Sequence, residues 1–335
     1  MTTPVGIVGF RGYSGAELVR ILSRHLNCRP VLLEHRADSA AHYIPRGEKP
    51  LKTIACNPQA VQEHSIKAVM LATPADVSME LAPALLQTGV TVVDLSGAFR
   101  LRTGENYKRW YREEHVADDL HSQAVYGLPE FYRENIKGAK LVSNPGCYPT
   151  AANLAIAPLV RCNLIERTAG IICDAKSGVS GAGRKPTLKT HFCEVSENFS
   201  AYSVLDHRHV PEVLMNSGLE ESEFSFVAHL IPIDRGILET VYFRGVEGLT
   251  AGRIIDTYES VYANEPFIRL YDPGIVPDIR AVQRTNFCDI GVKYDPATRR
   301  GVVITCIDNL VKGAAGQAVQ NLNLALGFPE TEGLL

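Results

Sequence analysis

Residues 5–24 of the chain read VGIVGFRGYSGAELVRILSR. They predict an apolar strand over 5–8, a glycine-rich turn, and a helix with one apolar face over 16–24. Glycines in such a turn permit a tight bend and let a pyrophosphate approach the backbone at the N-terminus of the helix. The spacing is G-x-x-G-x-x-G rather than the commoner G-x-G-x-x-G, so an ordinary glycine-rich turn stays open as the alternative.

Strand and helix patterns alternate through the first half of the chain. Short apolar strands are predicted at residues 31–33, 68–72, 91–95 and 141–142, and a helix at 79–86. Apolar strands that alternate with helices favour a parallel, doubly wound sheet whose two faces are both covered.

The second half of the chain has a different pattern. Longer β-rich segments occupy 170–173, 224–231, 236–243 and 302–306, with helices at 251–262 and 314–326. This favours a mixed or antiparallel sheet with helices on one face. Between the halves, residues 105–128 show little periodicity, and we expect a long loop with helical turns there.

Composition limits the classes of function that need to be considered. The 335 residues suit two domains, and the net charge of -3 gives no electrostatic reason to bind nucleic acid or an anionic membrane. We find no apolar run of the roughly 20 residues that span a bilayer and no signal peptide, so we expect a cytoplasmic protein. The eight cysteines include no C-x-x-C pair, which makes reduced thiols more probable than structural zinc or disulfides.

Cys147 is the candidate nucleophile. It lies in SNPGCYPTA, residues 143–151, after the predicted strand at 141–142 and before a helix predicted at 153–160. A thiol beside a helix N-terminus feels the positive end of the helix dipole, which favours the reactive thiolate. A buried structural cysteine is the alternative.

A dense titratable cluster, HRHVPE, occupies residues 207–212. A cysteine nucleophile needs an imidazole within hydrogen-bond reach, itself oriented by a third group. His207 and His209 are candidates for the imidazole and Glu212 for the orienting group. In an extended segment both histidines would face the same side, and we favour His207 slightly. His229 lies in an apolar strand and is expected to be structural.

Two further regions are candidate anion sites. The small-residue loop SGVSGAGR, residues 177–184, follows a strand directly and can expose successive N–H groups, with Arg184 adding charge. Arg100 follows the strand at 91–95, at the edge where doubly wound folds bind ligands. Arg100 and Arg235 can each grip a carboxylate or phosphate, and surface or ion-pairing arginines are the alternative.

In doubly wound folds, residues at the end of the second strand distinguish NAD from NADP. Glu34 could bind a ribose 2′-hydroxyl and would favour NAD, whereas Arg36, with Ser39 nearby, could bind a 2′-phosphate and would favour NADP. Spacing alone leaves both open.

Over nearly its whole length the chain resembles the N-acetyl-gamma-glutamyl-phosphate reductase family, type 1, of arginine biosynthesis. The segments that carry the resemblance are GFRGYSGAELVRIL, VDLSGAFRL, VYGLPEF, SNPGCYPTAANLAIAPL, SGVSGAGRK, HRHVPE, RGILET and DNLVKGAAGQAVQNLN. One departure is Arg11, which stands in the glycine turn where family members commonly carry a small residue.

The resemblance implies an α/β fold with two domains. A Rossmann-type, doubly wound NADP-binding domain would span 1–146, completed by a C-terminal helix at 312–335 that returns to pack on it. A catalytic and dimerisation α+β domain would span 147–311, of the kind found in glyceraldehyde-3-phosphate and aspartate-semialdehyde dehydrogenases. A homo-oligomer, dimer or tetramer, is implied as well.

The resemblance also implies an activity and a set of site residues. The activity is NADPH-dependent reduction of an acyl phosphate to an aldehyde through a thioester on Cys147, with His207, His209 and Glu212 as its other catalytic residues. The expected contacts of NADP(H) are Gly9, Arg11, Gly12, Tyr13, Ser14, Gly15, Arg36, Ser39, Ser177, Gly178 and Asn309, the last near the nicotinamide. Those expected for the substrate are Arg100, Asn144, Ser180, Gly181 and Arg184.

Two other functions stay open on the residues alone. A sister reductase of lysine biosynthesis or an aspartate-semialdehyde dehydrogenase would differ only in the shape of the substrate pocket. A non-catalytic dinucleotide-binding redox sensor would keep the glycine turn and a reactive Cys147 but would not need the HRHVPE cluster.

Overall fold

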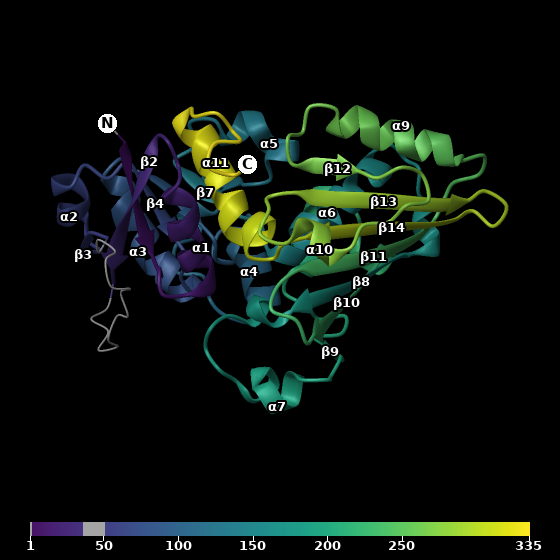
Figure 1. The fold of residues 1–335 in the computed structure, drawn as a ribbon, viewed down its shortest axis with the longest axis horizontal. Coiled ribbons are helices and arrows are strands. Elements are labelled where there is room, and N and C mark those ends of the chain that lie inside the picture. The colour runs from purple at the N-terminus through teal and green to yellow at the C-terminus, as the bar shows by residue number, and fades with distance from the viewer. Residues whose placement is uncertain (1, 36–50) are drawn as a thin grey trace. The chain divides into compact units, whose positions relative to one another are not determined.

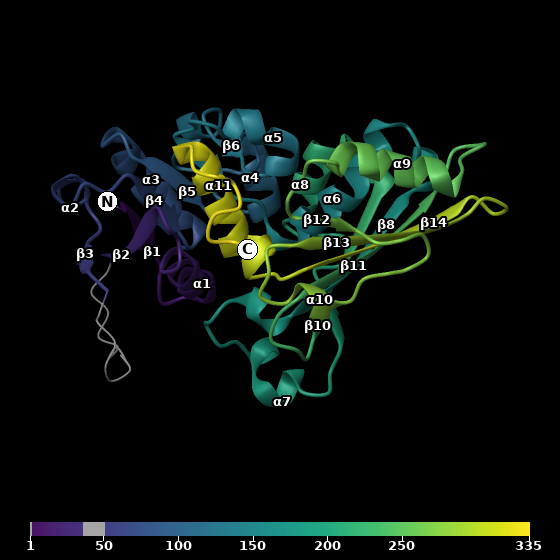
Figure 2. The ribbon, with the colours of Figure 1, turned by 45° about the horizontal axis from the view of Figure 1, so that its top comes forward.

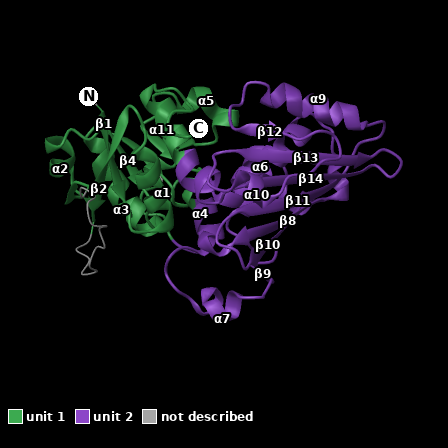
Figure 3. Ribbon diagram, viewed as in Figure 1, with its two compact units in different colours: residues 1–104, 114–144, 318–335 green, residues 105–113, 145–317 purple. Residues whose placement is uncertain are grey.

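The computed structural model describes residues 2–35 and 51–335, which form two compact units (Figure 3). Unit 1 comprises Met1–Gly104, Glu114–Asn144 and Ala318–Leu335, and unit 2 comprises Glu105–Glu113 and Pro145–Gln317. The chain thus divides two residues before the expected 146/147 boundary and six after the expected 311/312 boundary. That 105–113 groups with unit 2 was not anticipated.

Unit 1 is built on a parallel sheet of seven strands in the order β3-β2-β1-β4-β5-β7-β6 (Figure 1). All six strand pairings are parallel, which confirms the doubly wound sheet predicted from the alternating pattern. The strands are β1 (Thr3–Val8), β2 (Cys28–Glu34), β3 (Thr53–Ala55), β4 (Ala68–Leu71), β5 (Thr91–Asp94), β6 (Val125–Tyr126) and β7 (Leu141–Ser143). Every residue of the central β4 and β5 is buried, as both-face burial requires of an apolar strand.

The helices of unit 1 are α1 (Tyr13–Leu22), α2 (Pro58–Glu63), α3 (Ala75–Gln87), α5 (Pro129–Ile136) and most of α11 (Gly316–Leu326). α11 is tied to this unit by buried amides. Asn321 Nδ2 donates to the carbonyl of Gly127 at 2.8 Å and to Oδ1 of Asn144 at 3.0 Å. Near its end, Asn323 Oδ1 lies 2.9 Å from His25 Nε2.

Unit 2 contains a mixed sheet of seven strands in the order β12-β13-β14-β11-β8-β10-β9. The β8–β10 and β12–β13 pairs are parallel and the other four pairs are antiparallel, which confirms the predicted mixed sheet. Its strands are β8 (Ile171–Gly178), β9 (Ser200–Tyr202), β10 (Phe224–Ile231), β11 (Ile237–Arg244), β12 (Ile268–Leu270), β13 (Cys288–Asp295) and β14 (Arg300–Ile307).

The helices of unit 2 are α4 (Gly104–Tyr111), α6 (Cys147–Arg161), α7 (Phe192–Val195), α8 (Val210–Ser217), α9 (Ala251–Tyr262) and α10 (Ile279–Val282). Figure 2 shows α6, α8 and α9 along one side of the sheet, where α6 contacts β11 and β14. The hydroxyls of Tyr258 and Tyr262 on α9 donate to the carbonyls of Ala155 and Leu154. These contacts bury α6 from Tyr148 to Val160, so its first residue is held by a rigid core helix.

The helix predicted at 153–160 begins earlier, at Cys147, so its predicted start was wrong. The loop with helical turns expected over 105–128 contains α4, a 3₁₀ turn at Asp118–Leu120 and the two-residue strand β6, which was not expected. No helix among residues 2–35 and 51–335 is long and apolar enough to cross a bilayer.

Candidate functional site

The turn between β7 and α6 presents Cys147 as the first residue of a helix. Gly146 is the N-cap, with φ -65° and ψ 155°. Among the described residues, no side-chain capping hydrogen bond is found at this helix start. The Gly146 carbonyl accepts from the Thr150 N–H at 3.0 Å and from Thr150 Oγ1 at 2.9 Å. Cys147 therefore lies where helix N–H groups and the positive end of the dipole act together.

Glu212, on α8, is bound to this turn. Its carboxylate Oε2 accepts a hydrogen bond from the buried Gly146 N–H at 3.0 Å, and its side chain is fully buried. The Glu212 carbonyl accepts from Asn216 Nδ2 at 2.6 Å. This contact holds the backbone next to Cys147, and the expected role of Glu212 in orienting the histidines stays a prediction.

His209 is the N-cap of α8 and packs on the same glycine. A Cβ built on Gly146 would lie 2.7 Å from His209 Nε2, so the imidazole fits only because residue 146 has no side chain. The ring is 7% exposed. The cysteine turn, Glu212 and His209 therefore meet at one point, although the sequence separates them by some sixty residues.

His207 lies in the same cluster in a different environment. Its Nδ1 accepts the backbone N–H of His209 at 3.2 Å, which puts the proton of the neutral ring on Nε2. Burial, together with the adjacent Arg208 charge, lowers the pKa of His207 to about 4. The rings of His207 and His209 are 4.8 Å apart, so the sequence correctly grouped them, although the segment is a loop entering a helix and not an extended strand.

Two tyrosines that we did not single out complete the surroundings of Cys147. The hydroxyls of Tyr148, on α6, and Tyr202, on β9, are 3.0 Å apart. The Tyr148 ring lies edge-on to His207, with 5.4 Å between centroids. Burial raises the pKa of Tyr202 to about 12 and that of Tyr148 further, so both remain protonated donors. The one available signal was the position of Tyr148 next to Cys147.

A cavity of about 650 Å³ in unit 2 opens onto Cys147, Tyr148 and both histidines. It also has cationic side chains in its wall, Lys189 and Arg208, and these were likewise not singled out from the sequence. Ser177, Gly178 and Gly181, three of the expected site residues, line it as well. Arg184, which we expected at the substrate, is exposed and is not among the lining residues.

The loop after β8 is fixed by Asn309. Its Oδ1 accepts the Gly236 N–H at 2.7 Å and its Nδ2 donates to Ser180 Oγ at 3.0 Å. A Cβ on Gly181 would lie 2.9 Å from Ser177 Oγ and 3.7 Å from Asn309 Nδ2. The structure thus brings Ser177, Ser180, Gly181 and Asn309 together.

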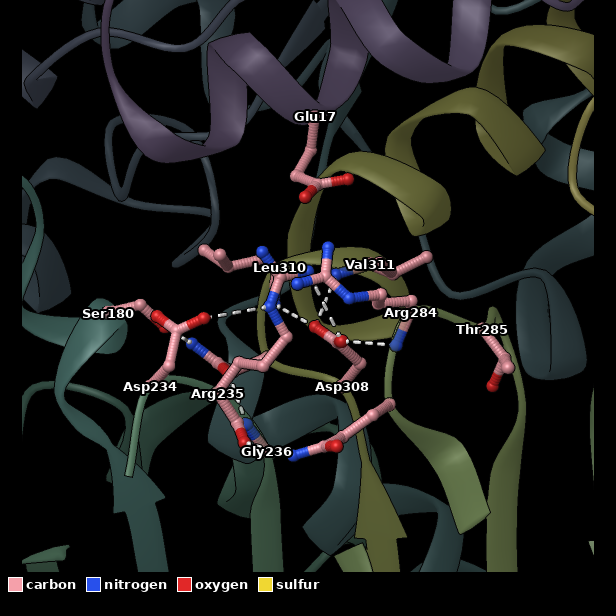
Figure 4. A network of polar contacts seen from close by, with 12 residues as sticks. Glu17, Ser180, Asp234, Arg235, Gly236, Arg284, Thr285, Asp308, Leu310 and Val311 are labelled. Carbon is pink, nitrogen blue, oxygen red and sulfur yellow. Dashed lines mark hydrogen bonds and ion pairs between the residues drawn. The ribbon is translucent and has the colours of Figure 1, made fainter. Parts of the chain in front are cut away.

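Asp308 organises the neighbouring polar network, shown in Figure 4. Its buried Oδ2 accepts the Arg284 N–H at 2.6 Å and lies 3.5 Å from Arg235 Nη1, while its Oδ1 accepts the N–H groups of Leu310 and Val311. These bonds position the π-helical turn Val311–Ala315. A Cβ on Gly313 would lie 2.8 Å from the Cβ of Cys147, so this turn packs directly on Cys147.

In unit 1 the glycine turn after β1 has the shape of a dinucleotide cradle. A Cβ on Gly9, which has φ +77°, would lie 2.2 Å from the Ala72 carbonyl oxygen, and one on Gly15 would lie 2.2 Å from that of Gly9. Gly12 is the N-cap of α1, without a side-chain cap among the described residues. The N–H groups of α1 are therefore approachable by a pyrophosphate, and the turn fits the group that the sequence predicted.

The cofactor-selecting end of β2 is partly described. Arg11 Nη2 donates to Glu34 Oε1 at 2.6 Å. Tyr13 and Ser14 lie at the start of α1, with Tyr13 exposed. Arg36 and Ser39, our candidates for the 2′-phosphate, lie outside the described residues.

Arg100 and Asn144 are both buried in unit 1. Arg100 Nε donates to the Asn144 carbonyl at 2.8 Å, and its Nη2 donates to the Leu95 carbonyl at 2.8 Å. Asn144 is further held by Asn321. The sequence placed Arg100 at the carboxyl edge of the sheet, and these bonds show that Arg100 and Asn144 help to fix the residues just before the cysteine turn.

Comparison with known proteins identifies the family. Residues 4–139 match the NAD-binding domain of the semialdehyde dehydrogenases, and residues 147–309 match their dimerisation domain. An N-acetyl-gamma-glutamyl-phosphate reductase from Symbiobacterium thermophilum is 47% identical over 100% of this chain and 98% of its own length. Another, from Desulforudis audaxviator, is 46% identical over 99% and 97%.

The chain belongs to the N-acetyl-gamma-glutamyl-phosphate reductase family. Within the wider group of semialdehyde dehydrogenases, it is similar in structure to aspartate semialdehyde dehydrogenase II from Vibrio cholerae, solved in complex with ASA. The TM-score is 0.72, with 17% identity and coverage of 98% of this chain and 99% of the other. This likeness confirms the expected fold class and, at such low identity, the fold alone. The dimerisation-domain match indicates a homo-oligomer.

Proposed function

We propose that the chain catalyses NADPH-dependent reduction of N-acetyl-gamma-glutamyl phosphate to N-acetyl-glutamate 5-semialdehyde and phosphate, in arginine biosynthesis. Full-length relatives at 44–47% identity carry this reductase name. The observation that carries the proposal is Cys147 at the first position of α6, with Glu212 bound to Gly146 and His209 packed on it.

The first half of the reaction is acyl transfer to the thiol. The Cys147 thiolate attacks the acyl carbon, the bond from that carbon to the phosphate oxygen breaks, and phosphate leaves with the electron pair. A thioester on Cys147 results. N–H groups at the start of α6 stabilise the oxyanion that forms during attack, since they already point at the site and need no reorganisation.

The second half is reduction of the thioester. Bound NADPH supplies the hydride. Cys147 then leaves as thiolate as the tetrahedral oxygen becomes the aldehyde carbonyl, and the thiolate takes back the proton that a neighbouring base removed from the thiol at the start of the first half. An imidazole within reach of the sulfur can take the proton of the thiol in the first half and return it in the second.

We assign that imidazole to His209 and revise our slight preference for His207. His209 lies against the residue that precedes the nucleophile. His207 is poorly suited, because its lowered pKa and its Nδ1 contact to the backbone keep it neutral. His207 then acts as a neutral Nε2–H donor toward the substrate. Glu212 is a positioning residue that fixes the Gly146 N–H and thereby the direction of the thiol.

We propose that the coenzyme is NADP(H). The family match supports the less specific statement that the first domain binds NAD. The proposed contacts are Gly9, Arg11, Gly12, Tyr13, Ser14, Gly15, Arg36, Ser39, Ser177, Gly178 and Asn309. Gly9 and Gly15 allow the tight turn before α1, since a Cβ on either would meet backbone atoms. Asn309 acts by holding the 177–182 loop through Ser180.

For the substrate we propose Ser180 and Gly181 in unit 2, together with Arg100, Asn144 and Arg184. The cavity wall adds Lys189 and Arg208, whose charges suit the α-carboxylate and phosphate of an acylated amino-acid phosphate. We further propose that the protein is a cytoplasmic dimer or tetramer.

The direct test is the reverse reaction, in which N-acetyl-glutamate 5-semialdehyde is oxidised in the presence of NADP and phosphate. The measured quantity is the rate at which NADPH appears. We expect kcat/KM for this aldehyde to exceed that for aspartate semialdehyde by at least about two orders of magnitude. Aspartate semialdehyde lacks the acetyl group, and its carboxylate lies one methylene nearer the aldehyde, so polar groups of the pocket are left unpaired. Preference for aspartate semialdehyde would assign the chain to the sister activity. Coenzyme binding without turnover of either aldehyde would favour a redox sensor.

A further inference from the structure

We propose that the ion pair between Arg11 and Glu34 is a coenzyme-selecting device. Arg11 pairs with the Glu34 carboxylate, so that Glu34 does not accept hydrogen bonds from the ribose hydroxyls of NAD. Arg11 also presents its guanidinium to the 2′-phosphate of NADP(H). The inference rests on the proposed coenzyme-dependent function.

The backbone places the two residues at the same edge of the sheet. β1 and β2 are parallel neighbours, with Val8 opposite Leu33, so the residues that follow each strand emerge side by side. Arg11 comes from the glycine turn after β1, and Glu34 is the last residue of β2. Ligands of doubly wound sheets bind outside these carboxyl ends, with the pyrophosphate on the first helix and the ribose toward the second strand.

The side-chain geometry joins them directly. Arg11 Nη2 lies 2.6 Å from Glu34 Oε1, and the two side chains are 27% and 31% exposed, so the pair faces solvent and can be reached by a ligand. The Arg11 guanidinium also lies 4.6 Å from the centre of the Phe10 ring, which restricts its orientation. A guanidinium can bridge a carboxylate at one edge and a phosphate at another, because its donors are arranged as a planar fork.

The charges explain which coenzyme the pair prefers. A carboxylate at the end of the second strand, without a cation beside it, accepts the ribose hydroxyls of NAD and repels the 2′-phosphate of NADP. Arg11 offsets that repulsion and occupies one of the two carboxylate oxygens, Oε1. Removing Arg11 should therefore weaken NADPH and favour NADH, whereas an arginine that only stabilises the turn would affect both coenzymes alike.

The experiment is isothermal titration calorimetry of the full-length protein with NADPH and with NADH, without substrate. The measured quantity is the ratio of the NADH Kd to the NADPH Kd. We expect Arg11→Ala to lower this ratio by about thirtyfold or more, mostly through an NADPH Kd raised about ten- to a hundredfold, the usual effect of losing one charged hydrogen bond. Arg11→Lys, which keeps the charge but not the fork, should lower it less.

Two further variants complete the test. Arg133→Ala is the matched control, because Arg133 forms a comparably buried ion pair with Glu330 in the same unit, and its ratio should equal that of wild type. The double variant Arg11→Ala/Glu34→Gln should bind NADH more weakly than Arg11→Ala does. The reason is that glutamine is a weaker acceptor for the ribose hydroxyls than the Glu34 carboxylate. Thermal unfolding of each apo variant checks folding, which a partly exposed ion pair affects little.

The outcomes separate this inference from the proposed function. A ratio within about threefold of wild type in both Arg11 variants would overturn the inference, as would equal NADH affinity with and without the Glu34 change. Wild-type protein that binds neither coenzyme would instead refute the proposed function itself.

Discussion

The turns that begin α1 and α6 share one backbone design but differ in the chemistry around it. Each follows a parallel strand, and each helix has a glycine N-cap in extended conformation, Gly12 with ψ 168° and Gly146 with ψ 155°. Neither is capped by a side chain within the described part of the chain. Both leave helix N–H groups able to stabilise an anion.

What separates the two turns is their surroundings. The space at the α1 turn is made by further glycines, Gly9 and Gly15, whose Cβ positions backbone atoms already occupy. The α6 turn carries a thiol, and a buried carboxylate and an imidazole from α8 meet its N-cap. A helix N-terminus alone can bind an anion. The proposed reaction site adds a thiol, a carboxylate and an imidazole to such an N-terminus.

The change expected to have the largest effect is Cys147→Ser, which removes only the nucleophile from the α6 turn. Turnover should fall by several orders of magnitude, because serine without a strong base is a far weaker nucleophile. Coenzyme binding, followed by calorimetry, should be unchanged. Cys162→Ser, at the C-cap of the same helix, is the control and should keep full activity. Retention of more than about a tenth of wild-type kcat by Cys147→Ser would exclude Cys147 as the nucleophile.

The next change separates the two histidines. His209→Asn should lower kcat by about 10²–10⁴, the usual contribution of a general acid–base group. His207→Asn should raise the substrate KM more than it lowers kcat. The measurement is the pH–rate profile of each variant between pH 6 and 9. The assignment is wrong if His209→Asn keeps a near-normal rate, and if both variants do so another group transfers the proton.

Gly15→Ala acts on the α1 turn and sharpens the comparison from the other side. The new Cβ would lie 2.2 Å from the Gly9 carbonyl oxygen, so the turn must shift and the NADPH Kd should rise about ten- to a hundredfold. Release of one phosphate per chain from the acyl phosphate, measured without coenzyme, should persist. Gly252→Ala is the control, since its Cβ meets no atom nearer than 4.0 Å. Loss of the phosphate burst in Gly15→Ala would show that the two turns are not independent.

The smallest effect is on stability and concerns the buried His207. Its folded pKa of about 4 lies below the 6.5 of an unperturbed histidine, so the unfolded chain binds the extra proton. This contribution is fully present above pH 6.5 and is lost as pH falls toward 4, by roughly 3 kcal/mol at full effect. Thermal unfolding of wild type should therefore weaken over this window more steeply than that of His207→Asn. Parallel curves would show that His207 is not buried as a neutral ring.

The elements that sequence predicted best are those whose burial follows a simple period. The helix at 251–262 and the strand at 224–231 have the predicted bounds, since one apolar face decides each. β13 was missed because it carries a buried Asp289 and a glycine where an apolar alternation was sought. Arg269 on β12 bonds that carboxylate at 2.6 Å, a compensation that no local pattern reveals.

The sequence by itself determined the two strand-to-helix turns, the place of Cys147 at the second of them, and the family. These features depend on residues adjacent in the chain, where glycine permits the bend and the helix end provides the field. Only the tertiary structure decided which atoms the remaining side chains contact. It placed Glu212 on the Gly146 N–H across 66 residues, put His209 against Gly146, and paired Arg11 with Glu34. Which of several eligible side chains reaches a given atom depends on how the core packs the elements that carry them, and no local pattern specifies that packing.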